Sequence, residues 1–174
     1  MGVLIDTNVL SELRKGARCD PHVREWYAGV SESDIYVSVI VLGEIRRGAE
    51  LLRRRDPVAA ASLSAWLLAL RESLADRLLP VTDEIADRWG QLGVPDALPV
   101  ADGLLAATAL VHDLVLVTRN TRDVQRSGAR LLDPFGFTEW RHRFLASALI
   151  RRTVSASVVF RAPAFLPAAR ETRR

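Results

Sequence analysis

The sequence predicts an α/β fold with a central, mostly parallel sheet, and three observations support this prediction. Apolar residues make up 49% of the 174-residue chain and aromatic residues only 6%, so the expected core is aliphatic, as in α/β proteins. Short apolar runs end at acidic or polar residues, as buried parallel strands do at their carboxyl ends. These runs alternate with stretches of helical spacing, which predicts right-handed crossovers.

Five short strands are expected, and they cover residues 3–5, 34–38, 78–81, 114–117 and 130–132. The first strand stops at Asp6, and the fourth stops at a polar segment that runs from Thr118 to Asp123. Both ends would lie outside the carboxyl edge of a parallel sheet, where open α/β sheets bind their ligands.

Helices are expected between these strands, at residues 8–15, 39–54, 56–76, 82–92 and 100–113. Residues suited to N-caps precede them, including Asp6, Ser38 and Thr82. The apolar face of the helix over 39–54 is predicted to comprise Ile40, Gly43, Ile45 and Leu51. The face of the helix over 56–76 is predicted to comprise Leu63, Trp66, Leu67, Leu70 and Leu74.

The composition excludes several classes of protein. A single cysteine, Cys19, rules out an internal disulfide and any zinc site built from cysteines. The amino terminus lacks the basic region of a signal peptide, and no stretch approaches the ~20 apolar residues that span a bilayer. We therefore expect a cytoplasmic protein with no membrane association.

The positive charge of the chain is concentrated at its carboxyl end. The whole chain carries +3, with a pI of about 9.7, but residues 141–174 contain eight arginines and one acidic residue. This segment therefore carries +7, and residues 1–140 carry −4. The basic pI is no evidence that residues 1–140 bind a polyanion.

Four acidic residues from distant parts of the chain are predicted to meet at one edge of the sheet. Asp6 and Asp123 follow strands, whereas Glu44 and Asp102 lie near the amino ends of two helices that start at that edge. Clustered carboxylates repel one another unless a cation compensates them. Mg²⁺ prefers oxygen ligands, and it can activate water and stabilise the charges of phosphodiester hydrolysis.

Each acid also has an ordinary structural interpretation that its position alone does not exclude. Asp6 can be a plain N-cap, Asp102 an acid favoured by the start of its helix, and Asp123 a turn or cap residue. Glu44 can be a solvated helix residue that pairs with Arg47.

Four segments in one order and spacing resemble the motifs of PIN domains, and in particular VapC-like toxins of bacterial VapBC pairs, including the FitB-like branch. The segments are Leu4 to Leu10, Ser38 to Gly48, Pro99 to Ala109 and Leu116 to Asp123. The resemblance covers about residues 2–136 and implies a three-layer sandwich. It divides the chain into a PIN domain at 1–140 and an Arg- and Ala-rich extension at 141–174.

The resemblance implies an acidic core of Asp6, Glu44 and Asp102, with Asp6 and Asp102 as direct ligands of Mg²⁺, or of Mn²⁺. The fourth position is open, because Asn120 ends the strand where some relatives have Asp, and Asp123 offers a carboxylate three residues later. Thr7 and Thr118 would support the ligands with their hydroxyls.

The function implied by the resemblance is that of an endoribonuclease toxin that hydrolyses structured RNA, either transfer RNA or ribosomal RNA. A cognate VapB-like antitoxin would inhibit it, and the chain would form a homodimer or a toxin–antitoxin hetero-oligomer. Arg46, Arg47 and 53–55 could contact RNA phosphates or simply form a solvated helix face. The extension is either a basic arm for RNA or a segment without a selected role, and its composition favours the second.

Three other functions are less consistent with the residues. A haloacid-dehalogenase-type phosphatase needs a second Asp two residues after its nucleophile, where this chain has Asn8. A phospho-receiver domain needs a lysine late in the chain, whereas Lys15 is the only lysine. A non-catalytic module of the same fold that binds RNA or an antitoxin remains the alternative, and the intact acids argue against it.

Overall fold

The computed structural model describes residues 1–136 and contains one five-stranded sheet in which every strand pair is parallel. The order across the sheet is β3-β2-β1-β4-β5. The strands are β1 (Val3–Ile5), β2 (Ile35–Ser38), β3 (Leu78–Leu79), β4 (Val115–Val117) and β5 (Arg130–Leu132). The prediction of an α/β fold with a central, mostly parallel sheet is confirmed.

The strand order creates a switch point between β1 and β4. The chain first builds outward from β1 to β2 and β3, and then returns to the other side of β1 for β4 and β5. Val3 pairs with Val115 and Ile5 with Val117, so β1 and β4 end at the same level. In open parallel sheets, the crevice outside the carboxyl ends of two such strands is the usual place for a ligand.

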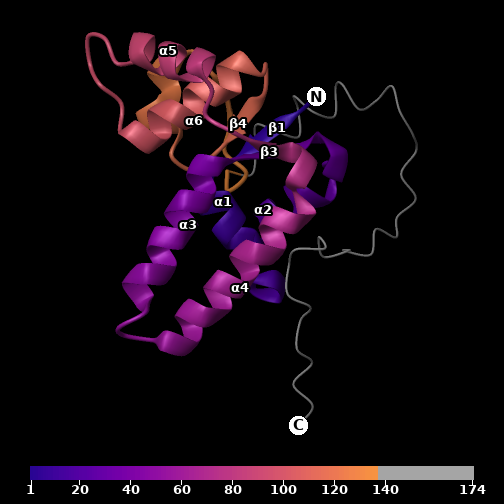
Figure 1. Cartoon of the computed structure of the whole chain (residues 1–174). Coiled ribbons are helices and arrows are strands. Elements are labelled where there is room, and N and C mark those ends of the chain that lie inside the picture. Colours follow the sequence, from indigo (N-terminus) through magenta and orange to yellow (C-terminus); the bar gives the residue numbers. More distant parts are fainter. Residues whose placement is uncertain (137–174) are drawn as a thin grey trace, which may run out of the picture.

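Helices cover the sheet on both sides (Figure 1). The α5–α6 pair lies at the top of the view, whereas α1 to α4 lie below the strands and α3 and α4 form a long hairpin. The helices are α1 (Thr7–Leu13), α2 (Pro21–Ala28), α3 (Val39–Leu52), α4 (Pro57–Ser73), α5 (Asp83–Leu92), α6 (Val100–Val111) and α7 (Thr121–Val124). The layers agree with the sandwich expected from the sequence.

The aliphatic core lies between the sheet and these helices. All three residues of β1 are at most 1% exposed, and the predicted face of α4 is largely buried, with Leu70 at 0%. The predicted face of α3 is correct at Ile45, which is buried, and at Ile40, which packs against the core, but wrong at Gly43 and Leu51, which are exposed. The helix buries Val41, Leu42, Ile45 and Ala49. Leu51 is 68% exposed, because α3 extends beyond the sheet as one arm of the α3–α4 hairpin and its last turn passes the core.

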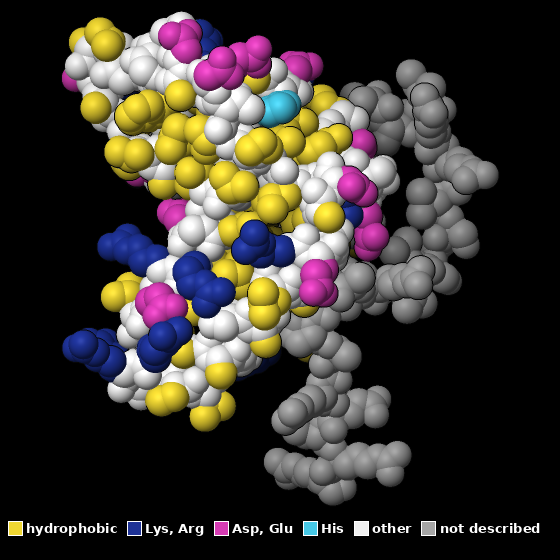
Figure 2. Space-filling model, viewed as in Figure 1, with side chains coloured by type: hydrophobic (Ala, Val, Ile, Leu, Met, Phe, Trp, Pro, Cys, Tyr) yellow, Lys and Arg dark blue, Asp and Glu magenta, His cyan; other side chains and the backbone are white. Residues whose placement is uncertain are grey.

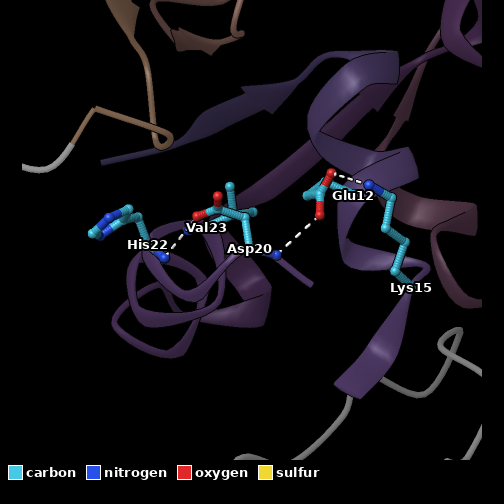
Figure 3. A network of polar contacts seen from close by, with 5 residues as sticks. All are labelled: Glu12, Lys15, Asp20, His22 and Val23. Atoms are coloured by element: carbon cyan, nitrogen blue, oxygen red, sulfur yellow. Dashed lines mark hydrogen bonds and ion pairs between the residues drawn. The ribbon is translucent and has the colours of Figure 1, made fainter. Parts of the chain in front are cut away.

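Helix α2 was not expected from the sequence, although its start is well capped. The Asp20 carboxylate accepts hydrogen bonds from the backbone N–H groups of His22 (2.9 Å) and Val23 (3.4 Å), and Pro21 occupies the first turn. The Glu12 carboxylate of α1 accepts from the Asp20 N–H at 2.9 Å and from Lys15 Nζ at 2.6 Å (Figure 3). These contacts join the end of α1 to the start of α2.

The structural description ends at residue 136, so the predicted domain boundary at 140 and the extension at 141–174 lie outside the described residues. Within residues 1–136, no helix is long and apolar enough to cross a membrane.

Candidate active site

Asp6 occupies the switch point between β1 and β4. Its backbone N–H donates to the carbonyl of Val117 at 3.0 Å, which continues the β1–β4 ladder by one residue. Its side chain is 6% exposed and accepts at Oδ1 a hydrogen bond of 2.5 Å from the backbone N–H of Thr7, at the start of α1. Asp6 is thus both the N-cap of α1 and a buried carboxylate at the carboxyl ends of β1 and β4.

Two side chains hold the other oxygen of this carboxylate. Asn8 Nδ2 and Thr118 Oγ1 each donate to Asp6 Oδ2 at 2.6 Å. The same Thr118 hydroxyl accepts from Asn8 Nδ2 at 3.1 Å and from the backbone N–H of Asn120 at 3.0 Å. Oδ2 is therefore occupied by two donors, whereas Oδ1 has one and keeps a free acceptor position.

Asn120 connects two further carboxylates. Its Nδ2 donates to Asp102 Oδ2 at 3.3 Å and to Asp123 Oδ2 at 2.8 Å. Asp102 lies in the first turn of α6 and Asp123 in α7, directly after β4. The two candidates for the fourth position are therefore neighbours joined by a hydrogen bond, rather than alternatives on separate surfaces.

Glu44, in the second turn of α3, contacts α1 rather than the arginines that follow it. The hydroxyl of Thr7 donates a short hydrogen bond to Glu44 Oε2. Among residues 1–136, Glu44 forms no ion pair, so the alternative interpretation of a pair with Arg47 does not describe it. Thr7 thus bridges the first and second acidic motifs.

The carboxylates of the site carry negative charge that no nearby lysine or arginine of residues 1–136 neutralises. Burial raises the pKa of Asp6, against the lowering effect of its donors Thr118, Thr7 and Asn8. Burial also raises the pKa of Asp102, and the negative charges of Asp6, Glu44 and Asp123 raise it further. Within the described part of the chain, none of the four carboxylates has a lysine or arginine as an ion-pair partner.

The residues that surround Asp102 fix the position of α6. A Cβ atom at Gly103 would lie 2.9 Å from Cδ1 of Trp89, so only glycine lets α5 approach α6 this closely without a shift. The start of α6 is joined to the segment after β4 by the hydrogen bond that Asn120 donates to Asp102.

An all-oxygen donor set with unbalanced negative charge is suited to a hard divalent cation. No three His, Cys, Asp or Glu side chains within residues 1–136 lie close enough together to hold a metal ion by themselves. A site with only one or two direct carboxylate ligands still fits Mg²⁺, which is usually held in this way and completes its octahedron with water and substrate oxygens.

Asn8 is a functional candidate that the sequence analysis did not select. It donates to Asp6 and Thr118, and its Oδ1 accepts from the backbone N–H of Arg119 at 3.1 Å. It therefore ties the end of β1 to the end of β4. Its position two residues after a strand-terminal Asp was the available signal, but the pairing of β1 with β4 was needed to interpret it.

Burial of Asp102 and the repulsion from its acidic neighbours predict that Asp102→Asn stabilises the protein without added metal at pH 7. Because the pKa of Asp102 is raised in the folded protein, the ionised carboxylate destabilises the fold. This cost is absent below pH 3.8, where Asp102 is protonated, and it appears as the pH rises through the folded pKa. We expect the Tm to rise by about 1–3 °C at pH 7, a modest gain because water screens a half-exposed charge. The gain should vanish near pH 4 in thermal unfolding, and an equal gain at both pH values would contradict this prediction.

Comparison with known proteins identifies the family. The model of the PIN domain matches residues 3–129. The chain belongs to the PIN domain family. This PIN domain is 30% identical to Toxin FitB of Neisseria gonorrhoeae over 142 residues, which cover 76% of this chain and 98% of that toxin. It is also 30% identical to VapC ribonuclease Y4jK of Sinorhizobium fredii over 140 residues, covering 76% of this chain and 97% of the relative.

Solved structures show the same relationship. The PIN domain superposes on FitAB bound to a DNA fragment with a TM-score of 0.69 and 26% identity, covering 79% of this chain and 99% of that chain. A DNA-bound VapBC of Salmonella typhimurium gives a TM-score of 0.58 and 27% identity, with coverage of 77% and 98%. The relatives thus include a protein named a toxin and a protein named a ribonuclease, and the structural relatives are FitAB and VapBC.

Proposed function

We propose that this PIN domain is a metal-dependent endoribonuclease toxin that hydrolyses phosphodiester bonds in structured RNA, such as a transfer RNA or a ribosomal RNA loop. The observation that supports it most is the set of four carboxylates without cationic partners around the β1–β4 switch point. Names of the relatives, which include toxins and ribonucleases, support the same activity.

In this proposal Asp6 and Asp102 are direct ligands of Mg²⁺ or Mn²⁺, and Glu44 and Asn120 complete the site. Held by these residues, a divalent cation would supply activation of a water molecule and stabilisation of the charge that develops on the phosphodiester. Asp6 would use Oδ1, because Oδ2 is filled by Asn8 and Thr118. Asp123 orients the amide of Asn120 and adds negative charge that favours the cation.

Thr7 and Thr118 would keep the ligand carboxylates in place. Thr118 holds Asp6 from the β4 side, whereas Thr7 holds Glu44 and, through its backbone N–H, Asp6. Such supporting partners usually matter about 10- to 100-fold for metal affinity or activity.

We further propose a VapB-like antitoxin as the inhibitory partner, as the toxin–antitoxin complexes of the structural relatives suggest. Pairing of the chain with itself or within such a complex is supported by exposed apolar side chains near α5 and α6, where Figure 2 shows hydrophobic residues gathered. Among them, Val94 is 78% and Val100 is 61% exposed.

The arginines after Glu44 are candidate contacts for RNA phosphate, and Figure 2 shows dark blue side chains over α3 and α4. Part of this charge is compensated, because Arg53 pairs with Glu50 at 2.9 Å and Arg46 lies 3.9 Å from the same carboxylate. On α3, Arg47 is therefore a better candidate than Arg46 for binding an RNA phosphate, because no acid within residues 1–136 pairs with Arg47.

Metal removal tests this function directly. The full chain, stripped with EDTA, is incubated with total RNA with and without millimolar MgCl₂ or MnCl₂, and the new RNA ends are mapped by sequencing. We expect specific cleavage with metal and a loss of at least about 100-fold without it, because the cation supplies several kcal/mol of charge stabilisation. Mg²⁺ should also raise the Tm, since it binds the folded chain alone.

Cleavage that is indifferent to EDTA would contradict the metal site. RNA binding without cleavage under either metal would instead favour a non-catalytic module of the same fold.

A further inference from the structure

Arg119 lies between two residues of the acidic site. Its neighbours Thr118 and Asn120 bond to Asp6 and to Asp102, and its own backbone N–H donates to Asn8 Oδ1 at 3.1 Å. The backbone of Arg119 is therefore fixed at the carboxyl edge of the sheet, directly after β4.

The side chain of Arg119 is held by an aromatic ring rather than by an acid. Its guanidinium carbon lies 4.9 Å from the centre of the Phe135 ring, within cation–π range. Phe135 follows β5, packs against the hydrophobic core, and has its backbone N–H bonded to Asp133 Oδ1 at 2.9 Å. The ring is thus a fixed support at the same edge of the sheet as the carboxylates.

Several arginines of residues 1–136 pair with acids, whereas Arg14, like Arg119, lies over an aromatic ring, 5.4 Å from the centre of Trp66. Arg53 pairs with Glu50, Arg126 with Asp96 and Arg130 with Asp113, at 2.7–2.9 Å. Arg119 is exposed and, within residues 1–136, has no ion pair and no side-chain hydrogen bond. Stacking uses the face of the guanidinium and leaves its N–H donors available to an anion.

A polyanion that approaches four carboxylates is repelled unless cations line its path. A guanidinium donates two parallel hydrogen bonds to phosphate, and a side chain already held by a ring loses less conformational freedom when it binds. We propose that Arg119, held on Phe135, binds a backbone phosphate of the RNA next to the phosphodiester that is cleaved. This inference rests on the proposed ribonuclease function and names a substrate-binding residue for it.

The test compares Arg119→Ala and Arg119→Lys with Arg130→Ala, a matched control at the opposite, amino end of β5. All variants are made in the full chain, so that residues 141–174 contribute equally to each. Cleavage of bulk transfer RNA with Mg²⁺ gives kcat and KM for each variant. For the binding measurement, each substitution is combined with Asp6→Asn to prevent cleavage, and fluorescence anisotropy gives the affinity for the same RNA at several salt concentrations.

We expect Arg119→Ala to raise KM about 10-fold with kcat nearly unchanged. The slope of log affinity against log salt is negative, and this variant should make it shallower by about 0.7–1, as loss of one phosphate contact does. Arg119→Lys should keep the salt slope but recover only part of KM, because lysine lacks the planar fork. Phe135→Leu, which keeps apolar volume but removes the ring, should raise KM about 2- to 4-fold. Arg130→Ala should match the parent chain in both measurements.

Wild-type KM and salt slope in Arg119→Ala would overturn the inference, and so would a fall in kcat alone. If the parent chain cuts no RNA, the proposed nuclease function fails. The salt slope measured by binding still decides whether Arg119 contacts phosphate, so the two failures are distinguishable.

Discussion

Asp6→Asn is expected to lower the rate of RNA cleavage by about 1,000-fold, which corresponds to about 4 kcal/mol of lost stabilisation of the reaction. Asp6 is the most buried carboxylate of the site and the one whose Oδ1 remains open to a metal ion. The neutral amide cannot replace a charged ligand.

The fold should survive this substitution because its two effects on stability oppose each other. Three donors meet the Asp6 carboxylate, and asparagine has a single acceptor oxygen, so at least one hydrogen bond is lost. Against this loss, burial raises the pKa of Asp6, so the ionised group destabilises the fold above its folded pKa, and the neutral amide removes that cost. We expect a Tm within about 3 °C of the parent at pH 7.

Asp20→Asn is the matched control, because Asp20 caps α2 as Asp6 caps α1. Asparagine is an equally good N-cap, so this variant should keep both stability and cleavage. Cleavage by purified protein and thermal unfolding with and without Mg²⁺ give the readouts. The Tm of the parent and of Asp20→Asn should rise with Mg²⁺, whereas that of Asp6→Asn should not. Undiminished cleavage by Asp6→Asn would contradict the proposed site.

Thr118→Val is expected to have the largest effect on stability, a loss of about 2–3 kcal/mol in the free energy of unfolding, together with a 10- to 100-fold loss of cleavage. The hydroxyl is 2% exposed, donates to Asp6, and accepts from Asn8 and from the N–H of Asn120. Valine has the same shape, so its effect isolates the hydroxyl and leaves two partly buried donors without this partner.

Thr118→Ser should restore cleavage to within about 3-fold, because it keeps the hydroxyl and loses one methyl group, worth about 1 kcal/mol. Thr108→Val is the control for a buried threonine away from the acids, since its hydroxyl donates to the carbonyl of Leu104 within α6 at 2.7 Å. Urea unfolding gives the stabilities, and cleavage against Mg²⁺ concentration gives the metal requirement. Thr118→Val should need more Mg²⁺ than Thr108→Val; equal requirements would show that the hydroxyl acts on stability alone.

The local features of this PIN domain follow from the sequence. Short apolar runs that stop at Asp6 and at Thr118 predict parallel strands whose ends face a ligand, because burial on both sides of the sheet requires continuous apolar residues. Caps at Ser38 and Thr82 begin helices as expected, each accepting a backbone N–H. These are effects of residues close in the chain, which a sequence pattern contains.

The helix faces were harder to predict. Spacing alone assigned Leu51 to the buried face of α3, but the helix extends past the sheet, so that burial stops before its last turn. Helix α2 was not predicted, although the sequence contains its signals, namely the cap at Asp20 before Pro21 and a buried face of Val23, Trp26 and Tyr27.

What the sequence determined by itself is which acids are available and that each stands at a strand end or a helix start. Only the tertiary structure decided how they meet. Pairing of β1 with β4 places Asn8 and Thr118 on one oxygen of Asp6, and the docking of α6 places Asn120 between Asp102 and Asp123. The physical reason is that strand order and helix docking depend on contacts between residues far apart in the chain, from 18 positions for Asn120 and Asp102 to 112 for Thr118 and Asp6, which no local pattern specifies.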